Sequence, residues 1–214
     1  GMVHVRGNAK DFDNWGQLGL TDWTYDKVLP YFKKSESIEG LDSNFRGESG
    51  PLKLSRSPNG NILSQVYLNA AQQAGYQINN DMNGERQEGF GLMDTTIFNG
   101  KRQSTSVTYL HPIKHRSNLE ILTNVTVNKI LFENKKAVGV ECKANGENKK
   151  YFSSKEVLLS AGAINSPQLL MLSGIGPENE LSKYSIEPVE CLEGVGKNLQ
   201  DHLETYVPVS YTHL

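Results

Sequence analysis

A run of small residues between positions 161 and 176, AGAINSPQLLMLSGIG, carries the most specific chemical pattern in the sequence. It follows the apolar run 157–159 and leads into a helix that we expect to begin at Ser166 and Pro167, because serine caps helices and proline suits their first position. Small residues allow close backbone approach, and the N–H groups at a helix start can bind a pyrophosphate. Tight packing of a strand against a helix explains the same residues equally well.

A second polar pattern, GVGKNLQDHLE, occupies residues 194–204. It begins like a G-x-G-x-x-G dinucleotide fingerprint, but Leu199 stands where the third glycine should be and no amphipathic helix follows. We therefore reject that interpretation. Asp201, His202 and Glu204 place three functional polar groups within four residues. A solvated loop is the alternative interpretation, since such residues are mostly exposed.

The remaining reactive side chains form no pattern typical of a metal or disulfide site. Cys142 and Cys191 are far apart and make no C-x-x-C. They therefore predict neither a disulfide framework nor a zinc site. His111, His115 and His213 lack the spacing of metal ligands, so we predict no metal centre.

Composition narrows the class of protein. The 214 residues carry a net charge of −2, with acids and bases interspersed, which argues against a nucleic-acid-binding surface. No run approaches the roughly 20 apolar residues that span a bilayer. The sequence shows no signal or transit peptide.

The elements that must position these residues follow from periodicity and from turn residues. Helices are expected over 11–18, 25–35, 62–74, 104–110 and 166–172. Thr24 is expected to cap the second helix, and Pro30 to kink it or delay its start. Strands are expected over 92–98, 119–123, 125–132, 137–142, 150–152 and 156–160, with a turn at Asn99-Gly100 and loops over 40–50 and 79–91. This alternation predicts an α/β (mixed α+β) fold.

Two of these patterns resemble signatures of the glucose-methanol-choline (GMC) family of oxidoreductases. Residues 162–176 match the family's G-x-x-x-S-P-x-x-L-x-x-S-G-I-G segment, and residues 194–202 match its G-V-G-x-N-L-Q-D-H loop. The first seven residues are similar to its N-G-M-V-Y-x-R-G segment, with His4 in place of the tyrosine. The resemblance implies an FAD cofactor. It also implies which residues contact that cofactor: Gly1, Met2, Val3, Val127, Ala161 and Gly162.

The resemblance further implies a substrate. Choline-oxidising members of the family carry a glutamate two residues after the histidine of the second signature, as Glu204 follows His202 here. Both residues are expected to bind substrate. A quaternary ammonium has no N–H to donate, so a carboxylate and aromatic faces hold it. The expected reaction is oxidation of choline to betaine aldehyde. Another alcohol or sugar oxidoreductase of the family and a non-catalytic module with this fold are the alternatives.

By the same resemblance, residues 1–51 and 99–202 belong to an FAD-binding region, and 52–98 and 203–214 to a substrate-binding region. The family's G-x-G-x-x-G unit and its catalytic histidine lie outside these 214 residues, so no catalytic residue is predicted within them. We expect the chain alone to bind FAD weakly or not at all and not to oxidise choline. The family likeness implies a mitochondrial location with peripheral attachment to the inner membrane, and it indicates no electron acceptor.

Overall fold

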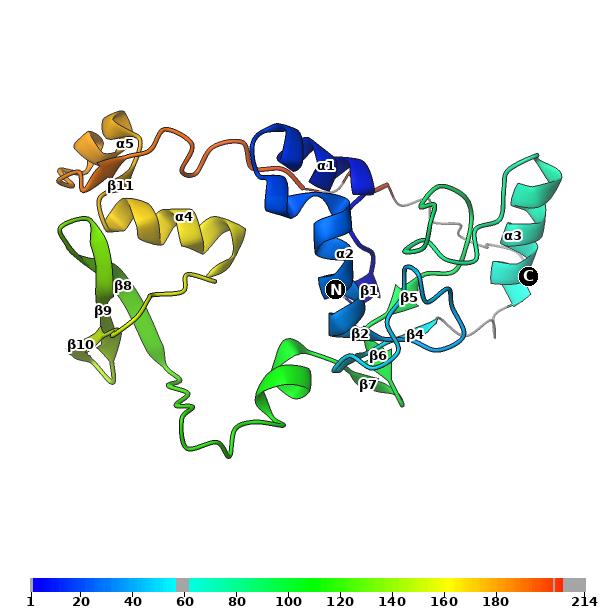
Figure 1. Cartoon of the computed structure of the whole chain (residues 1–214), viewed down its shortest axis with the longest axis horizontal. Coiled ribbons are helices and arrows are strands. Elements are labelled where there is room, and N and C mark those ends of the chain that lie inside the picture. Colours follow the sequence, from blue (N-terminus) through cyan, green and yellow to red (C-terminus); the bar gives the residue numbers. More distant parts are fainter. Residues whose placement is uncertain (1, 57–61, 202, 206–214) are drawn as a thin grey trace, which may run out of the picture. The chain divides into compact units, whose positions relative to one another are not determined.

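The computed structural model describes residues 2–56, 62–201 and 203–205. The chain divides into two compact units, which we call unit 1 (Gly1–Ile121) and unit 2 (Leu122–Leu214). Both contain helices and strands, which confirms the mixed α/β class (Figure 1). Among the described residues, no helix has the length and apolar character needed to cross a bilayer. The division into FAD-binding and substrate-binding segments stays a prediction.

Unit 1 begins with two helices held together by aromatic side chains. Helix α1 (Ala9–Gln17) starts with a capping box between Asn8 and Asp11, and helix α2 (Tyr25–Ser35) follows a short 3-10 turn, η1 (Thr21–Trp23). Phe12 makes edge contacts with Trp15 at 5.2 Å and with Phe32 at 5.6 Å between ring centroids. These rings tie α1 to α2, because offset and edge-on aromatic pairs add to the area that they bury.

The start of α2 differs from the expectation in two details. Thr24 occupies the N-cap position, but its side chain makes no capping hydrogen bond. The Tyr25 N–H instead donates to Asp13 Oδ1 of α1 at 3.0 Å. Pro30 lies inside the helix and does not delay its start. A side chain that is distant in sequence has therefore replaced the local cap.

The rest of unit 1 is made of very short strands and one more helix. Strands β1 (Val3–His4), β5 (Asp94–Thr95) and β4 (Ser55–Arg56) form an antiparallel sheet in that order. The other elements are β2 (Glu36–Ser37) parallel to β3 (Leu52–Lys53), α3 (Ile62–Gln73), the hairpin of β6 (Ile97–Phe98) and β7 (Lys101–Arg102), and the π-turn η2 (Ser106–Leu110). The predicted turn at Asn99-Gly100 is confirmed, since both residues have positive φ.

Unit 2 is built on a three-stranded antiparallel sheet in the order β10-β9-β8, with β8 (Val125–Glu133), β9 (Lys136–Ala144) and β10 (Glu147–Phe152) (Figure 1). Helix α4 (Gly162–Leu172) lies against β8. Strand β11 (Ile175–Gly176), helix α5 (Glu178–Lys183) and strand β12 (Glu190–Cys191) follow, with β11 parallel to β12.

Three sequence-based expectations for unit 2 and its border are wrong. Residues 119–123 and 156–160 are not strands, and no described segment pairs with them. Apolar side chains alone do not form a strand, because a strand also needs a neighbouring backbone to bond with. The predicted helix begins at Gly162 rather than at Ser166. Ser166 Oγ accepts the Ala161 N–H at 3.0 Å, so the serine reaches back to the residue before the helix.

Ser173, at the C-terminal end of α4, joins the helix to the sheet. Its side chain is fully buried. Its Oγ accepts the β8 Ile130 N–H at 2.8 Å and donates to the Leu169 carbonyl at 2.6 Å. Ile130, Cys142, Ala144 and Leu181 form the buried apolar core of this unit. The serine therefore satisfies a strand donor at the position where the helix packs on the sheet.

Replacing Ser173 with alanine should destabilise unit 2 by about 1–3 kcal/mol, because the buried Ile130 N–H loses its acceptor. Both tryptophans, Trp15 and Trp23, belong to unit 1, so fluorescence does not report on unit 2. Hydrogen–deuterium exchange of the β8 peptide measures the effect instead. The matched control is Ser182→Ala, an exposed serine bonded to Glu178 O at 2.8 Å, which should change stability by less than about 0.5 kcal/mol. Equal effects of the two replacements would contradict this role for Ser173.

Candidate functional site

Met2 and Val3, two of the predicted cofactor contacts, lie on and next to strand β1 in unit 1. Val3 pairs with Thr95 of β5, and the Met2 carbonyl accepts the Thr96 N–H at 2.7 Å. Their side chains remain 44% and 57% exposed. The backbone of this segment is thus fixed while its apolar side chains face outward. Gly1, the third predicted contact of this segment, lies outside the described residues.

A buried carboxylate lies next to this segment. Glu36 is fully buried at the start of β2. Its side chain lies 2.8 Å from Arg46 Nε, 2.7 Å from an Arg6 terminal nitrogen and 3.1 Å from His4 Nε2, and it accepts the Gly47 N–H at 3.1 Å. A Cβ on Gly47 would collide with the Lys33 carbonyl, so glycine permits this close approach. His4 thereby ties β1 to the carboxylate.

Arg46 extends the same group of charges to two more carboxylates. Its guanidinium lies 2.5 Å from Asp81 Oδ1 and 2.9 Å from Asp94 Oδ2, and Arg56 Nε lies 3.1 Å from Asp94 Oδ1. We call the six residues Arg6, Glu36, Arg46, Arg56, Asp81 and Asp94 the ion cluster. Its three carboxylates balance its three guanidinium groups. A buried group of charges needs this pairing to offset the loss of hydration.

The side chain of Asn83 acts on the backbone of the β1 segment in the way a neighbouring strand would. Its Oδ1 accepts the Arg6 N–H at 2.8 Å, and its Nδ2 donates to the His4 carbonyl at 3.0 Å. Gln87 Nε2 donates to the Arg6 carbonyl at 2.8 Å. The backbone at His4 and Arg6 is therefore held by side chains that lie about 80 positions away in the sequence.

In unit 2, the predicted contacts lie on two elements. Val127 is on β8 and is 39% exposed, while Ala161 and Gly162 form the start of α4. No side chain caps this helix start, and Gly162 has a φ of +90° with open space where a Cβ would be. Within the described part of the chain, the first N–H groups of the helix thus lack a side-chain acceptor.

These two surfaces fit the predicted FAD. Exposed apolar residues such as Met2 and Val3 suit a flat aromatic ring system, and an uncapped helix start reached over a glycine suits the oxygen atoms of a phosphate. Each unit is described by itself, so the structure brings Met2 together with Val3 and Ala161 together with Gly162, but does not relate the two pairs. No three metal-binding side chains come together among the described residues in a way that could hold an ion.

The predicted substrate residues lie near the end of the described chain. Glu204 is exposed, lies outside any helix or strand, and makes no hydrogen bond or ion pair with the other described residues. His202 lies outside the described residues. An accessible carboxylate of this kind can face a cation. The substrate-binding role of Glu204 and the roles of the cofactor contacts stay predictions.

Sequence reasoning missed the ion cluster. Arg46 and Asp81 come from the segments 40–50 and 79–91, whose polar, glycine-rich composition indicates solvated loops. The other members lie on short strands or, in the case of Arg6, just after one. Only a weak sequence signal indicates the cluster. Its arginines and acidic residues lack the i, i+4 spacing of helix-surface pairs, and they occur in segments whose glycines allow tight backbone packing. The partners that balance these charges are distant in the sequence, so no local pattern reveals them.

Comparison with known proteins gives consistent matches over nearly the whole chain. The GMC oxidoreductase family is matched by residues 1–204. Mitochondrial choline dehydrogenase of Homo sapiens is 51% identical over 212 residues, which cover 99% of this chain and 36% of that protein. Oxygen-dependent choline dehydrogenase of Brucella anthropi is 45% identical over 207 residues, covering 97% and 38%. The chain thus spans little more than a third of these relatives.

A solved structure of an FAD-dependent enzyme has a similar fold. A solved FAD-dependent oxidoreductase of Chaetomium thermophilum superposes with a TM-score of 0.84 at 31% sequence identity, over 90% of this chain and 36% of that one.

The ion cluster predicts a loss of stability in acid. Burial alone would raise the pKa of the Glu36 carboxyl, but hydrogen bonds from His4, Arg46 and the Gly47 N–H, with the charge of Arg6, lower it from 4.5 to about 2. The unfolded chain therefore binds a proton before the folded chain does. Stability is complete above about pH 5 and should fall by about 3 kcal/mol as the pH drops from about 4.5 to 2.

Tryptophan fluorescence measures this loss, because Trp15 and Trp23 report on unit 1. Glu36→Gln should destabilise unit 1 by about 3–5 kcal/mol at neutral pH, because it leaves arginine charges buried without their partner. The variant should also lose much of the acid dependence. Exposed Glu39 provides the control variant Glu39→Gln, which should behave like the unchanged protein. The same pH dependence in all three proteins would show that Glu36 does not anchor the cluster.

Proposed function

Because this chain belongs to the GMC oxidoreductase family, we propose that it is part of an FAD-dependent enzyme that oxidises choline to betaine aldehyde. The family match and the FAD-dependent oxidoreductase with the same fold identify FAD as the cofactor. The observation that carries the choline assignment is identity of 45–51% to choline dehydrogenases across 97–99% of the chain. Choline is the substrate in the names of those relatives, and we propose the same substrate for the enzyme that contains this chain.

In this proposal, the chain supplies binding and orientation, while bound FAD supplies the hydride acceptor for the alcohol carbon. Met2 and Val3 present an apolar surface to the flavin, with Gly1 preceding them. Val127, Ala161 and Gly162 contact the rest of the cofactor, where the uncapped start of α4 offers N–H donors. The ion cluster and Asn83 hold the backbone of residues 2–6 in place, so that this surface is formed before the cofactor arrives.

Glu204 and His202 are the proposed substrate residues. The carboxylate of Glu204 is exposed and makes no hydrogen bond or ion pair with the other described residues. Within that part of the chain, no cation neutralises it. A trimethylammonium group offers charge without a hydrogen-bond donor, which makes a carboxylate the side chain best suited to attract it. His202, two residues earlier, is proposed to face the alcohol end of the same substrate.

The proposal includes a mitochondrial location. It is supported by the mitochondrial choline dehydrogenase of Homo sapiens, while the similar protein of Brucella anthropi comes from a bacterium. Attachment to the inner membrane stays a prediction.

Replacing Glu204 with glutamine tests the substrate assignment in the complete enzyme. The change keeps the size of the side chain and removes its charge. A lost charge-assisted contact is worth about 1.5–3 kcal/mol, or roughly one to two decades in affinity. We expect KM for choline to rise by that factor with a smaller change in kcat, because the cation is present in both the ground state and the transition state.

The uncharged analogue 3,3-dimethylbutanol provides the comparison, and its KM should change little. The control variant Glu187→Gln removes the same charge from another exposed position in unit 2 and should leave both substrates unaffected. If Glu204→Gln alters the two substrates equally, Glu204 has a structural role. The choline assignment then loses its physical support in this chain.

A further inference from the structure

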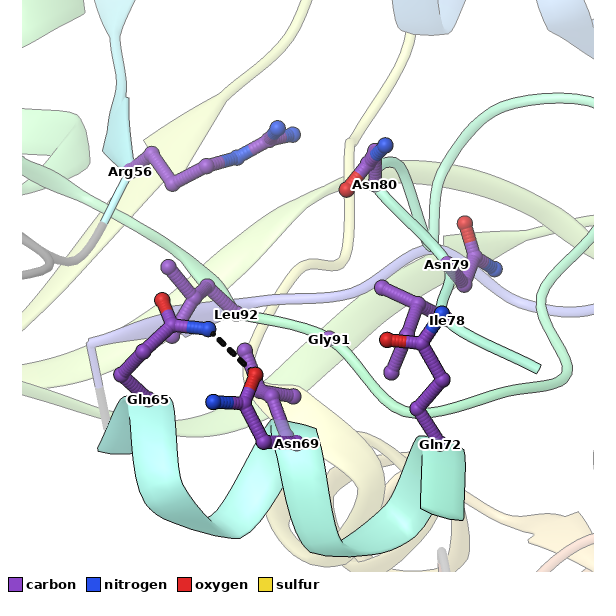
Figure 2. A pocket seen from close by; sticks show the side chains of 10 residues that line it. Arg56, Gln65, Asn69, Gln72, Ile78, Asn79, Asn80, Gly91 and Leu92 are labelled. Carbon is purple, nitrogen blue, oxygen red and sulfur yellow. Dashed lines mark hydrogen bonds between the residues drawn. The ribbon is translucent and has the colours of Figure 1, made fainter. Parts of the chain in front are cut away.

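Unit 1 contains a polar pocket whose lining includes none of the predicted cofactor and substrate residues. Its cavity is about 270 Å³ and lies between helix α3, strand β4 and the loop that includes Asn79, Asn80 and Leu92. Figure 2 shows Arg56 and Asn80 on one side of the pocket, facing Gln65, Asn69 and Gln72 of α3 on the other. Arg56 is the one charged side chain among the residues that line it.

The guanidinium of Arg56 has an N–H group without a hydrogen-bond acceptor among the described residues. Its Nε is bonded to Asp94 at 3.1 Å, which anchors the side chain to the ion cluster. One terminal nitrogen is buried and has no hydrogen-bond partner in the part of the chain that the structure describes, while the Arg56 side chain as a whole is 30% exposed, so part of the guanidinium is open to the pocket that it lines. A buried donor without an acceptor costs about 1–3 kcal/mol. The pocket therefore favours a ligand that brings an acceptor.

Side chains on both sides of the pocket supply further donors. Gln65 Nε2 donates to Asn69 Oδ1 at 2.9 Å, and this contact leaves the Asn69 NH₂ group available (Figure 2). The side chains of Gln72 and Asn80 make no hydrogen bond within the described residues, so their NH₂ groups are available too. Asn79 is different: its amide already bonds the Arg86 and Glu88 carbonyls and the Asp81 N–H. Three amide donors thus accompany one guanidinium donor.

We propose that this pocket binds a small organic carboxylate. The planar carboxylate matches the geometry of a guanidinium and of amide N–H groups. Leu68, Ile78 and Leu92 add apolar side chains to the lining, which suit a short hydrocarbon chain rather than a fully hydrated inorganic ion. The charge of Arg56 is shared with Asp94, so we expect weak binding, with a Kd of about 1 mM.

Propionate is the probe that matches this chemistry. It should be titrated into the 214-residue chain and into the complete enzyme at constant ionic strength, with side-chain NH₂ and guanidinium shifts followed by nitrogen-15 NMR. We expect saturable shifts at Asn69, Gln72, Asn80 and Arg56. Propionamide, the neutral match in size and shape, should produce none, and phosphate should bind more weakly than propionate.

Two variants test the residues of the pocket independently. Arg56→Gln should weaken propionate binding by about ten- to a hundredfold, as expected for a lost charge-assisted contact. Because this change also removes a partner of Asp94, Gln72→Glu serves as a second variant. It places a like charge on an exposed helix position without touching the ion cluster, and it should weaken binding severalfold. Arg116→Gln removes an exposed arginine outside the pocket and is the matched control.

Far-UV circular dichroism establishes that each variant is folded. The proposal is overturned if propionate produces no saturable shift, if propionamide binds as well, or if phosphate binds more tightly. It is also overturned if Gln72→Glu leaves the affinity unchanged. If the 214-residue chain binds propionate but the complete enzyme does not, the acceptor in the pocket belongs to the protein itself and the proposed ligand is wrong. None of these outcomes depends on choline oxidation.

Discussion

The buried carboxylate of Glu36 is the interaction on which unit 1 depends. The strands of this unit are two residues long, and among its described residues the buried apolar side chains are few, namely Ile38, Leu54 and Ala71. Ladder hydrogen bonds and apolar burial on that scale hold a chain weakly. Charge pairing joins the segments instead, and it does so only while every partner is present, because one unpaired charge in this interior is costly. The arrangement of the segments of unit 1 is therefore determined more by the pairing of charges than by the packing of apolar side chains.

The same cluster links the two candidate sites of unit 1. His4 contacts Glu36 and belongs to the strand that carries Val3, while Arg56 contacts Asp94 and lines the carboxylate pocket. The proposed flavin surface and the proposed pocket thus share a set of positioning contacts without sharing a ligand. Unit 2 is held together differently: a long antiparallel sheet packs against α4, and the buried Ser173 bonds the C-terminal end of that helix to β8.

Local signals explain how much of the fold could be predicted. Helices α1, α2 and α3 and the turn at Asn99-Gly100 follow from spacing and turn residues in their own segments. The strand expected at 156–160 failed because an apolar run reports side-chain character and not a backbone partner. The cofactor contacts came from family resemblance. The pocket of Arg56 was missed since isolated glutamines and asparagines carry no pattern until a fold gathers them.

The separation of contacts along the chain also sets the order in which the two units can form during synthesis. In unit 2, tight turns join β8 to β9 and β9 to β10, so the sheet closes as soon as its residues have been made. In unit 1, Glu36 and Arg46 emerge early, but Asp81 and Asp94 follow only after dozens of further residues. Until then Arg46 has one carboxylate instead of three. The nascent chain therefore exposes an incomplete cluster to solvent, and the first half of unit 1 becomes fixed only when β5 leaves the ribosome.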